Sequence, residues 1–269
     1  MTIVELFQFC QNIVNKDVHG MPFGIDQFNN VLSFVNMSLY QDSYATSKTV
    51  AEQGGDKLAN VLFQNNDLRN FIKNSLITNT TTTIGGLTIG RSPYPSDMEY
   101  PMMMWASGRD VEIVSAYLLR RIRAGVINRD FAEHPVAVET DGYFELYPND
   151  LTNLLLTYLK RPTKPYLDYC LDTGDVRVYM EVGSYVVYNL SLGYYNLYNQ
   201  DGTLAKANVT HDYFTGSAPS PTVIYTSLTT ELEWADTKHT HIANMILERM
   251  GVNLRSPEVA QWAAGRGDK

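Results

Sequence analysis

The chain has 269 residues, a formal net charge of −8 and 44% hydrophobic residues. This length is enough for one large domain or two smaller ones with a buried core, and the acidic balance argues against a surface built to neutralise nucleic-acid phosphates. No apolar run is close to the length of about 18 residues that a membrane-spanning helix needs. The start MTIVELFQF lacks the basic residues of a secretion signal. We therefore expect a soluble protein that is not secreted.

The N-terminal part of the chain shows helical periodicity. Residues 2–14 place apolar side chains on one helical face, and Thr2 with Glu5 forms a capping box. Two further helices are predicted, one after Gly24 and one over about residues 56 to 76, because each carries its own apolar stripe. Since three such stripes must cover one another, the pattern predicts a helical bundle.

The middle of the chain interrupts this pattern and then resumes it. Residues 79–101 hold the run NTTTT, several glycines and several prolines, which predicts a linker or a loose strand region. Residues 109–123 (RDVEIVSAYLLRRIR) return to helical spacing and predict a fourth helix. On it, Arg120, Arg121 and Arg123 are interpreted as a solvated face rather than as a patch that binds phosphates.

From Val136 the chain changes to short β-prone runs separated by turn residues. The predicted strands are YFELYP after Asp141-Gly142, LLLTYL, VRVYMEV, SYVVYNL and VIYTSL near residue 223. Asp201-Gly202 is a hairpin signal. After residue 229 helical spacing returns at Ile242 and Ile246, with Gly251 as the C-cap, and Ser256-Pro257 predicts the start of a short last helix.

These elements predict an α+β fold. Residues 1–135 and 229–269 are expected to form a helical bundle domain from the N-terminal and C-terminal helices. Residues 136–228 are expected to form an inserted antiparallel β-rich domain, with an added hairpin near residues 185–210.

One stretch, residues 15–26 (NKDVHGMPFGID), has the spacing of a helix–loop–helix calcium loop. Histidine is a poor calcium ligand, and the aspartate at the last position is too short to replace the bidentate glutamate of such loops. A turn between two helices, with a glycine ending the first helix, explains the same residues without an ion. We expect neither a metal nor a cofactor here. The residues concerned are Asn15, Asp17, His19, Gly20 and Asp26.

Motifs for catalysis are missing from the sequence. It contains no GxSxG elbow and neither of the two common glycine-rich nucleotide loops. His239 and His241 are two residues apart and point in different directions on a helix, and the pair Glu231 and Glu233 gives a glycosidase no specific support. A hydrolase acting on cell-wall sugars is therefore a weaker hypothesis than the structural and ligand-binding functions considered below, and we expect no enzymatic activity. Two cysteines, Cys10 and Cys170, are expected to be buried reduced thiols.

The segment between Tyr166 and Tyr225 is dense in aromatic residues. Tyrosine on strands serves both core and subunit packing and dedicated ligand surfaces, so both interpretations stay open. If the surface binds a ligand, a glycan is the expected class, and the expected contacts are Tyr194, Tyr195 and Tyr198.

Three stretches carry a resemblance to a known family. They are FQFCQNIVNKDVHGMPFGIDQFNNVLSFVNMSLYQ, HPVAVETDGYFELYPNDLTNLLLTYLKRPTKPYLDY and ELEWADTKHTHIANMILERMGVNLRSPEVAQWA. Together, and in this order, they resemble the head-to-tail connector proteins, also called adaptor or neck ring proteins, of short-tailed phages of the crAss-like type. Residues 185–228 depart from that pattern and are interpreted as an added β-hairpin.

The resemblance implies a structural virion protein without catalytic residues. Such a protein forms a homo-oligomeric ring, a dodecamer by this likeness, that docks under the portal protein and contacts other neck or tail proteins. It implies assembly in the host cytoplasm, a place in the virion neck or tail, no membrane, and a lumen through which DNA passes without specific binding. An acidic chain suits such a wall because it repels phosphates.

The C-terminal residues suggest one contact for such a ring. Leu254, Val259 and Trp262 are apolar groups on the predicted last helix. They are candidates for docking onto a neighbouring copy or onto the portal. Packing of the same helix on the chain's own bundle is an equally open alternative.

Overall fold

The computed structural model describes residues 1–17, 23–54, 57–84, 87–123, 131–189, 193–211, 214 and 223–251. The helices described are α1 (Ile3–Asp17), α2 (Ile25–Gly54), α3 (Leu58–Gln64), the 3-10 turn η1 (Arg69–Phe71), α4 (Ala116–Arg123) and α5 (Asp236–Arg249). The strands of the N-terminal half and centre are β1 (Ile72–Ile77), β2 (Thr80–Ile84), β3 (Leu87–Pro93), β4 (Met98–Ala106), β5 (Arg109–Val114), β6 (Val136–Glu139), β7 (Tyr143–Tyr147) and β8 (Leu154–Lys160). The later strands are β9 (Asp168–Leu171), β10 (Arg177–Met180), β11 (Tyr185–Asn189), β12 (Tyr194–Tyr198), β13 (Leu204–Val209) and β14 (Val223–Thr226). The protein has an α+β fold with helices at both ends of the chain, as expected.

The chain divides into two compact units, which are described separately. Unit 1 comprises residues 1–41 and 163–269, and unit 2 comprises residues 42–162. This division differs from the expected domain boundaries. The strands β1 to β5 lie within residues 72–114, which were expected to belong to the helical bundle domain, and the strands β9 to β14 share a unit with the terminal helices.

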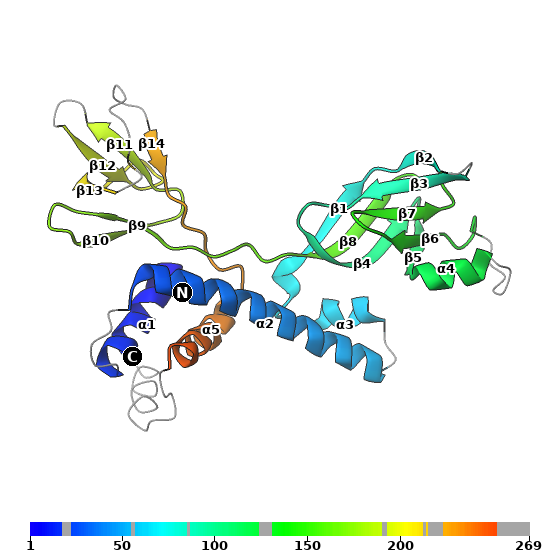
Figure 1. The fold of residues 1–269 in the computed structure, drawn as a ribbon, viewed down its shortest axis with the longest axis horizontal. Helices are drawn as coiled ribbons and strands as arrows, with labels where there is room; N and C mark the ends of the chain where they lie inside the picture. Colours follow the sequence, from blue (N-terminus) through cyan, green and yellow to red (C-terminus); the bar gives the residue numbers. More distant parts are fainter. Residues whose placement is uncertain are drawn as a thin grey trace. The chain divides into compact units, whose positions relative to one another are not determined.

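Unit 1 contains α1, α5 and the first part of α2 (Figure 1), and aromatic side chains pack between α1 and α2. The capping box predicted at the start of α1 is confirmed, because the Thr2 amide donates to Glu5 Oε2 over 2.8 Å and the Glu5 amide donates to Thr2 Oγ1 over 3.2 Å. The fully buried ring of Phe7 lies 5.1 Å from that of Phe28 on α2 and 5.4 Å from that of Tyr179 on β10. Helix α5 packs against α1 and completes the helical part of the unit.

Two buried asparagines on α2 connect the helices of unit 1 to the chain that leads into its strands. Asn29 makes two hydrogen bonds with the backbone of Leu167, at 2.9 and 2.8 Å. Asn36 donates to the Thr163 carbonyl over 3.2 Å and accepts a 2.7 Å hydrogen bond from the indole of Trp234. Because each amide is satisfied on both its donor and acceptor sides, these contacts fix the direction of the chain without leaving buried polar groups unpaired.

The strands of unit 1 form a four-stranded sheet, in the order β13-β12-β11-β14, and the pair β9-β10. The predicted hairpin at Asp201-Gly202 is confirmed between β12 and β13, where Gly202 has a φ of +83°. Cys10 and Cys170 are both buried free thiols, as predicted, and burial raises the pKa of each to about 12. The apolar core beneath the strands comprises Cys170, Met180, Val186, Leu197, Val209 and Phe214.

Unit 2 is built on an eight-stranded sheet in the order β1-β8-β4-β5-β6-β7-β3-β2. Within the described residues, all strand pairs of this sheet are antiparallel except β5 with β6, which are parallel and are joined by the chain that passes through α4. One face of the sheet carries a core that includes Met104, Phe144 and Leu156. The other face packs against α4 through a second cluster that includes Leu119 and Val136, and α3 contacts β4. Figure 1 shows α3 and α4 on the same side of this sheet.

The third predicted helix is much shorter than expected. Helix α3 ends at Gln64, because the Asn65 side chain accepts the Asp67 amide over 2.9 Å and turns the chain. The residues at 68 to 76 that continue the helical spacing instead form η1 and β1. The prediction was wrong in that half, since a four-residue spacing also places side chains on one face of a strand.

The predicted helix over residues 109–123 was half right. Its first six residues form β5, in which Val111 and Ile113 face the core of the sheet and Glu112 is exposed. This period of two, with β-branched residues, prevails over the helical period. Helix α4 begins after Ser115, whose hydroxyl accepts the Leu118 amide over 3.2 Å. The segment 79–101 contains β2, β3 and the start of β4, so the strand alternative of its prediction is confirmed.

Candidate interaction site

Most of the possible metal ligands of the N-terminal turn lie where the structure does not describe side chains. Residues 18–22, which include His19 and Gly20, lie outside the described residues, and Asp26 stands in the first turn of α2. Across the part of the chain that the structure describes, no three His, Cys, Asp or Glu side chains come together in a way that holds a metal ion.

The acidic and histidine residues near α5 have structural partners. Glu231 accepts the Ile3 amide over 2.8 Å, and Glu233 accepts hydrogen bonds from both the amide and the hydroxyl of Thr163. The buried imidazole of His239 lies 3.2 Å from the Trp234 carbonyl. These contacts join the start of α1 and the entry to the strands to the segment that precedes α5.

The three candidate tyrosines do not form one surface. Tyr195 points toward the core of unit 1, where its ring lies 5.4 Å from that of Phe214. Tyr198 stacks on Tyr185 of β11, with ring centroids 5.6 Å apart and an interplanar angle of 14°. Because alternate residues of a strand face opposite sides, Tyr195 lies on the other face of β12 from Tyr194 and Tyr198. The packing interpretation accounts for Tyr195, and Leu254, Val259 and Trp262 lie outside the described residues.

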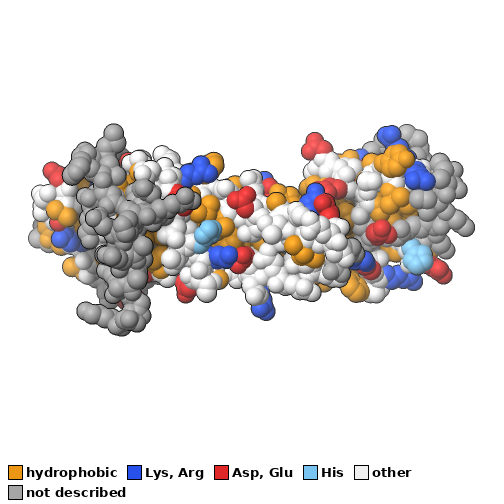
Figure 2. Space-filling view, turned by 90° about the horizontal axis from the view of Figure 1, so that it is seen from below, with side chains coloured by type: hydrophobic (Ala, Val, Ile, Leu, Met, Phe, Trp, Pro, Cys, Tyr) orange, Lys and Arg blue, Asp and Glu red, His pale blue; other side chains and the backbone are white. Residues whose placement is uncertain are grey.

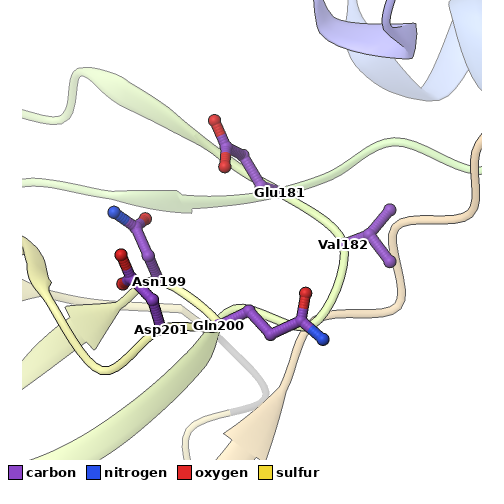
Figure 3. Close-up of a pocket in the computed structure, with 5 residues that line it drawn as sticks. All are labelled: Glu181, Val182, Asn199, Gln200 and Asp201. Atoms are coloured by element: carbon purple, nitrogen blue, oxygen red, sulfur yellow. The ribbon is translucent and has the colours of Figure 1, made fainter.

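An open polar pocket of about 440 Å³ lies between two turns of unit 1 (Figure 3). The turn after β10 contributes Glu181 and Val182, and the turn after β12 contributes the other three side chains. Thr203 donates its amide and its hydroxyl to Asp201 Oδ1, at 2.9 and 2.6 Å, and these hydrogen bonds lower the pKa of Asp201. The pocket thus offers amides and carboxylates to a polar ligand. It is lined by Glu181, Val182, Asn199, Gln200 and Asp201.

Three large apolar side chains stand in a row on the sheet of unit 2. Leu155 of β8 is directly opposite Leu76 of β1 on one side and Trp105 of β4 on the other. Their exposed fractions are 78% for Leu76, 37% for Leu155 and 41% for Trp105. Directly opposed residues on neighbouring strands share one face of a sheet, so the three side chains form one contiguous strip. We refer to Leu76, Leu155 and Trp105 as the apolar row.

The face that carries the apolar row is covered at its other end. Leu159, four residues after Leu155 on the same face of β8, is fully buried. Opposite it, Tyr100 of β4 stacks on Tyr44 of α2 with ring centroids 3.8 Å apart. The C-terminal part of α2 therefore shields one end of this face, whereas the apolar row at the other end is open to solvent.

A groove of about 560 Å³ runs between α3 and the strands β4 and β5 of the same unit. Met103 contributes to it and lies two residues before Trp105, on the same face of β4. Lys57 and Asp110, at the edge of the groove, form an exposed ion pair of 3.8 Å. The groove is lined by residues 57–60, 102, 103 and 110–113.

Neither the apolar row nor the groove was predicted from the sequence. The signal that marks them is the run MMMW at residues 102–105, because four consecutive large apolar residues cannot all face one core from a strand. That run alone does not identify Leu76 and Leu155 as its neighbours, since they lie on strands that are distant in sequence. The strand register supplies this information.

Comparisons with known proteins identify no relative. No known protein family matches the sequence, and no curated protein matches it. Within the described residues, no helix combines the length and the apolar character needed to cross a membrane.

Proposed function

We propose that this chain is a structural virion protein that forms a ring of identical copies in the neck of a short-tailed phage. The ring connects the portal to the tail and leaves a lumen through which DNA passes. The proposal assigns no catalytic step to the chain. It joins the sequence resemblance to a surface of the kind that subunit contacts use.

The observation that supports this proposal is the apolar row. Monomeric soluble proteins rarely expose contiguous patches of large apolar side chains, and such patches are typical of interfaces. Tryptophan is also among the residue types most enriched at energetic hot spots. Removing one exposed leucine or tryptophan side chain fully from water contributes about 1.5–3 kcal/mol, so the row can supply several kcal/mol to each contact between copies.

The net charge of −8 is compatible with the lumen of such a ring. A wall with acidic side chains repels DNA phosphates and avoids the release of counterions that would hold the DNA in place. Charge thus favours free passage of DNA, whereas the apolar row favours assembly. The two features serve different parts of the proposed function.

The proposal predicts that polar substitutions in the apolar row reduce assembly. Trp105→Glu and Leu76→Asp should each shift the protein from rings to smaller species, with about a tenfold weaker association, because each places a charge in a desolvated contact. Mass photometry of the protein, alone and mixed with its portal, measures the distribution of species. Both side chains are exposed, so the melting temperature should stay within a few degrees of the unmodified protein.

Leu228→Asp is the matched control, because Leu228 is also exposed but belongs to unit 1. This variant should assemble like the unmodified chain. A strictly monomeric particle, both alone and with the portal, would remove the ring proposal. Rings that persist unchanged in both row variants would remove the apolar row as its contact.

The pocket in Figure 3 favours a second candidate function, a tail-associated module that binds glycans. Amide and carboxylate side chains are suited to sugar hydroxyls, and Tyr198 immediately precedes the turn that lines the pocket. Tyr195 is not part of this site because it packs on the core.

Under this second function, Glu181→Gln combined with Gln200→Ala should reduce binding on a glycan array by about tenfold or more, since two polar contacts are lost. Val223→Ala, at an exposed position on β14 that does not line the pocket, is the control and should bind normally. If the unmodified protein binds no glycan on the array, this second function is refuted.

A further inference from the structure

Helix α4 presents one aromatic and two basic side chains to solvent. Tyr117 is 71% exposed, and Arg120 and Arg121 are exposed beside it, three and four residues further along the helix. The Arg121 guanidinium lies 6.0 Å from the centre of the Tyr117 ring. The opposite side of α4 is buried through Leu119 and Ile122. The outward side is therefore a compact surface on a helix that is itself held against β6.

The groove between α3 and β4-β5 has complementary chemistry. Its apolar lining includes Met102 and Met103, whose flexible thioethers adapt to a partner and make favourable contacts with aromatic rings. Its edge carries the carboxylates of Asp110 and Glu112 and the ammonium of Lys57. A volume of about 560 Å³ is large enough for an aromatic ring with the stems of two arginines.

The groove is continuous with the apolar row. Asp110 is directly opposite Trp105 in the pairing of β5 with β4, so the acidic edge and the row adjoin on one face of the sheet. A partner that enters the groove with an aromatic and basic helix face thus also approaches Trp105. Figure 2 shows hydrophobic and basic side chains next to each other near its right-hand end, over the part of unit 2 that carries α4.

The two surfaces belong to the same chain but are not the same patch. A contact between them in two copies is head to tail, and such contacts close into a ring when the rotation between copies permits. The planar guanidinium of arginine is well suited to bind carboxylates. Because the arginines lie on one surface and the carboxylates on the other, this pairing gives the contact a direction. A contact of identical patches would instead give a closed dimer.

We infer that the copies of the proposed ring meet head to tail, with Tyr117, Arg120 and Arg121 of one copy seated in the groove between α3 and β4-β5 of the next. This inference rests on the proposed ring function. It names the partner of the groove as a second copy of this chain, and it assigns the apolar row to the edge of the same contact.

The inference predicts that charge reversal on either side disrupts assembly and that reversal on both sides restores it. The double variant R120E/R121E should form smaller species, with an association at least about tenfold weaker, because carboxylates would then face carboxylates. D110K/E112K should do the same from the other side. A chain that carries all four changes should form rings again, since opposite charges are restored in the opposite sense.

Mass photometry and sedimentation at low and high salt measure these outcomes, and melting curves show whether each variant is folded. K48E/K164E is the control for R120E/R121E, because it changes the net charge by the same amount. It reverses the charge of two exposed lysines that belong to neither surface. Rings of the unmodified protein should weaken with salt, as ion pairs at the rim of a contact are screened.

The outcomes separate this inference from the ring proposal. Rings that are unchanged in R120E/R121E would overturn the inference and leave the ring proposal standing. Disruption by each pair without restoration in the fourfold variant would also overturn the pairing of these two surfaces. An unmodified protein that stays monomeric, alone and with the portal, would instead refute the ring itself.

Discussion

Replacing Phe7 by alanine should lower the free energy of unfolding by about 3–5 kcal/mol, the usual cost of removing a buried phenylalanine. The ring of Phe7 is fully buried and contacts Phe23, Phe28 and Tyr179 at centroid distances of 5.6, 5.1 and 5.4 Å. Its loss leaves a cavity at the point where α1, α2 and β10 meet, and that cavity cannot collapse without moving all three. Urea unfolding followed by circular dichroism measures the change.

Phe34→Ala is the matched control for this prediction. Phe34 is also a phenylalanine on a helix of unit 1, but it is 53% exposed and its ring is covered by the Arg249 guanidinium at 4.1 Å. Its removal should cost about 1 kcal/mol or less, the value of an exposed cation–π contact. If Phe7→Ala and Phe34→Ala lowered the free energy of unfolding equally, the central role of Phe7 in the packing of unit 1 would be contradicted.

Replacing the buried Asp168 by alanine should lower the free energy of unfolding by about 2–4 kcal/mol, because the Tyr225 hydroxyl and the Leu228 amide would both lose their carboxylate partner. One carboxylate oxygen of Asp168 accepts the hydroxyl of Tyr225 at 2.8 Å and the amide of Leu228 at 3.0 Å. The Asp168 amide in turn donates to Thr229 Oγ1. This buried carboxylate therefore connects the start of β9 to the segment that follows β14.

Asp168→Asn tests whether the hydrogen bonds or the volume of the side chain cause this loss. The asparagine oxygen can still accept from Tyr225 and Leu228, whereas its amide nitrogen cannot accept from the Tyr169 amide that donates to Asp168 Oδ1, so the variant should recover part of the stability. Asp42→Ala, at an exposed position on α2, should change stability by less than about 0.5 kcal/mol. Amide exchange at residues 225–229 is the second measurement, and unchanged protection there in Asp168→Ala would refute the proposed connection.

Local signals in the sequence predicted the ends of elements well. The capping box of Thr2 and Glu5, the turn at Asp201-Gly202 and the C-cap at Gly251, with its φ of +78°, are all found. Each depends on a few neighbouring residues and on backbone geometry that those residues favour. These signals place helices and turns without knowledge of distant contacts.

The sheet of unit 2 could not be derived in the same way. Its edge strand β1 pairs with β8, about eighty positions later in the chain, and nothing near residues 72–77 indicates that partner. Local spacing at 68 to 76 and at 109 to 114 fitted a helix, and the pairing of distant strands overrode it. Propensity is a weak guide wherever tertiary contacts decide between helix and strand.

The candidate site shows the same limit. The tyrosines of β12 were chosen by composition, which does not say which face of the strand each one occupies. The apolar row became visible only when the register placed Leu76, Leu155 and Trp105 opposite one another. The pairing of strands decides which residues become neighbours on a surface built from several strands. A single sequence therefore shows the residues but not which of them lie side by side.

The parallel pairing of β5 with β6 determines how tension on α4 would be carried. The two strands are adjacent at the centre of the strand order, and the chain between them passes through α4. A pull on this helix is therefore transmitted to hydrogen-bonded strands in the middle of the sheet, not to a peripheral loop. Each of these strands is hydrogen-bonded on both sides, so a contact made through α4 would load the centre of the sheet of unit 2 rather than an edge strand.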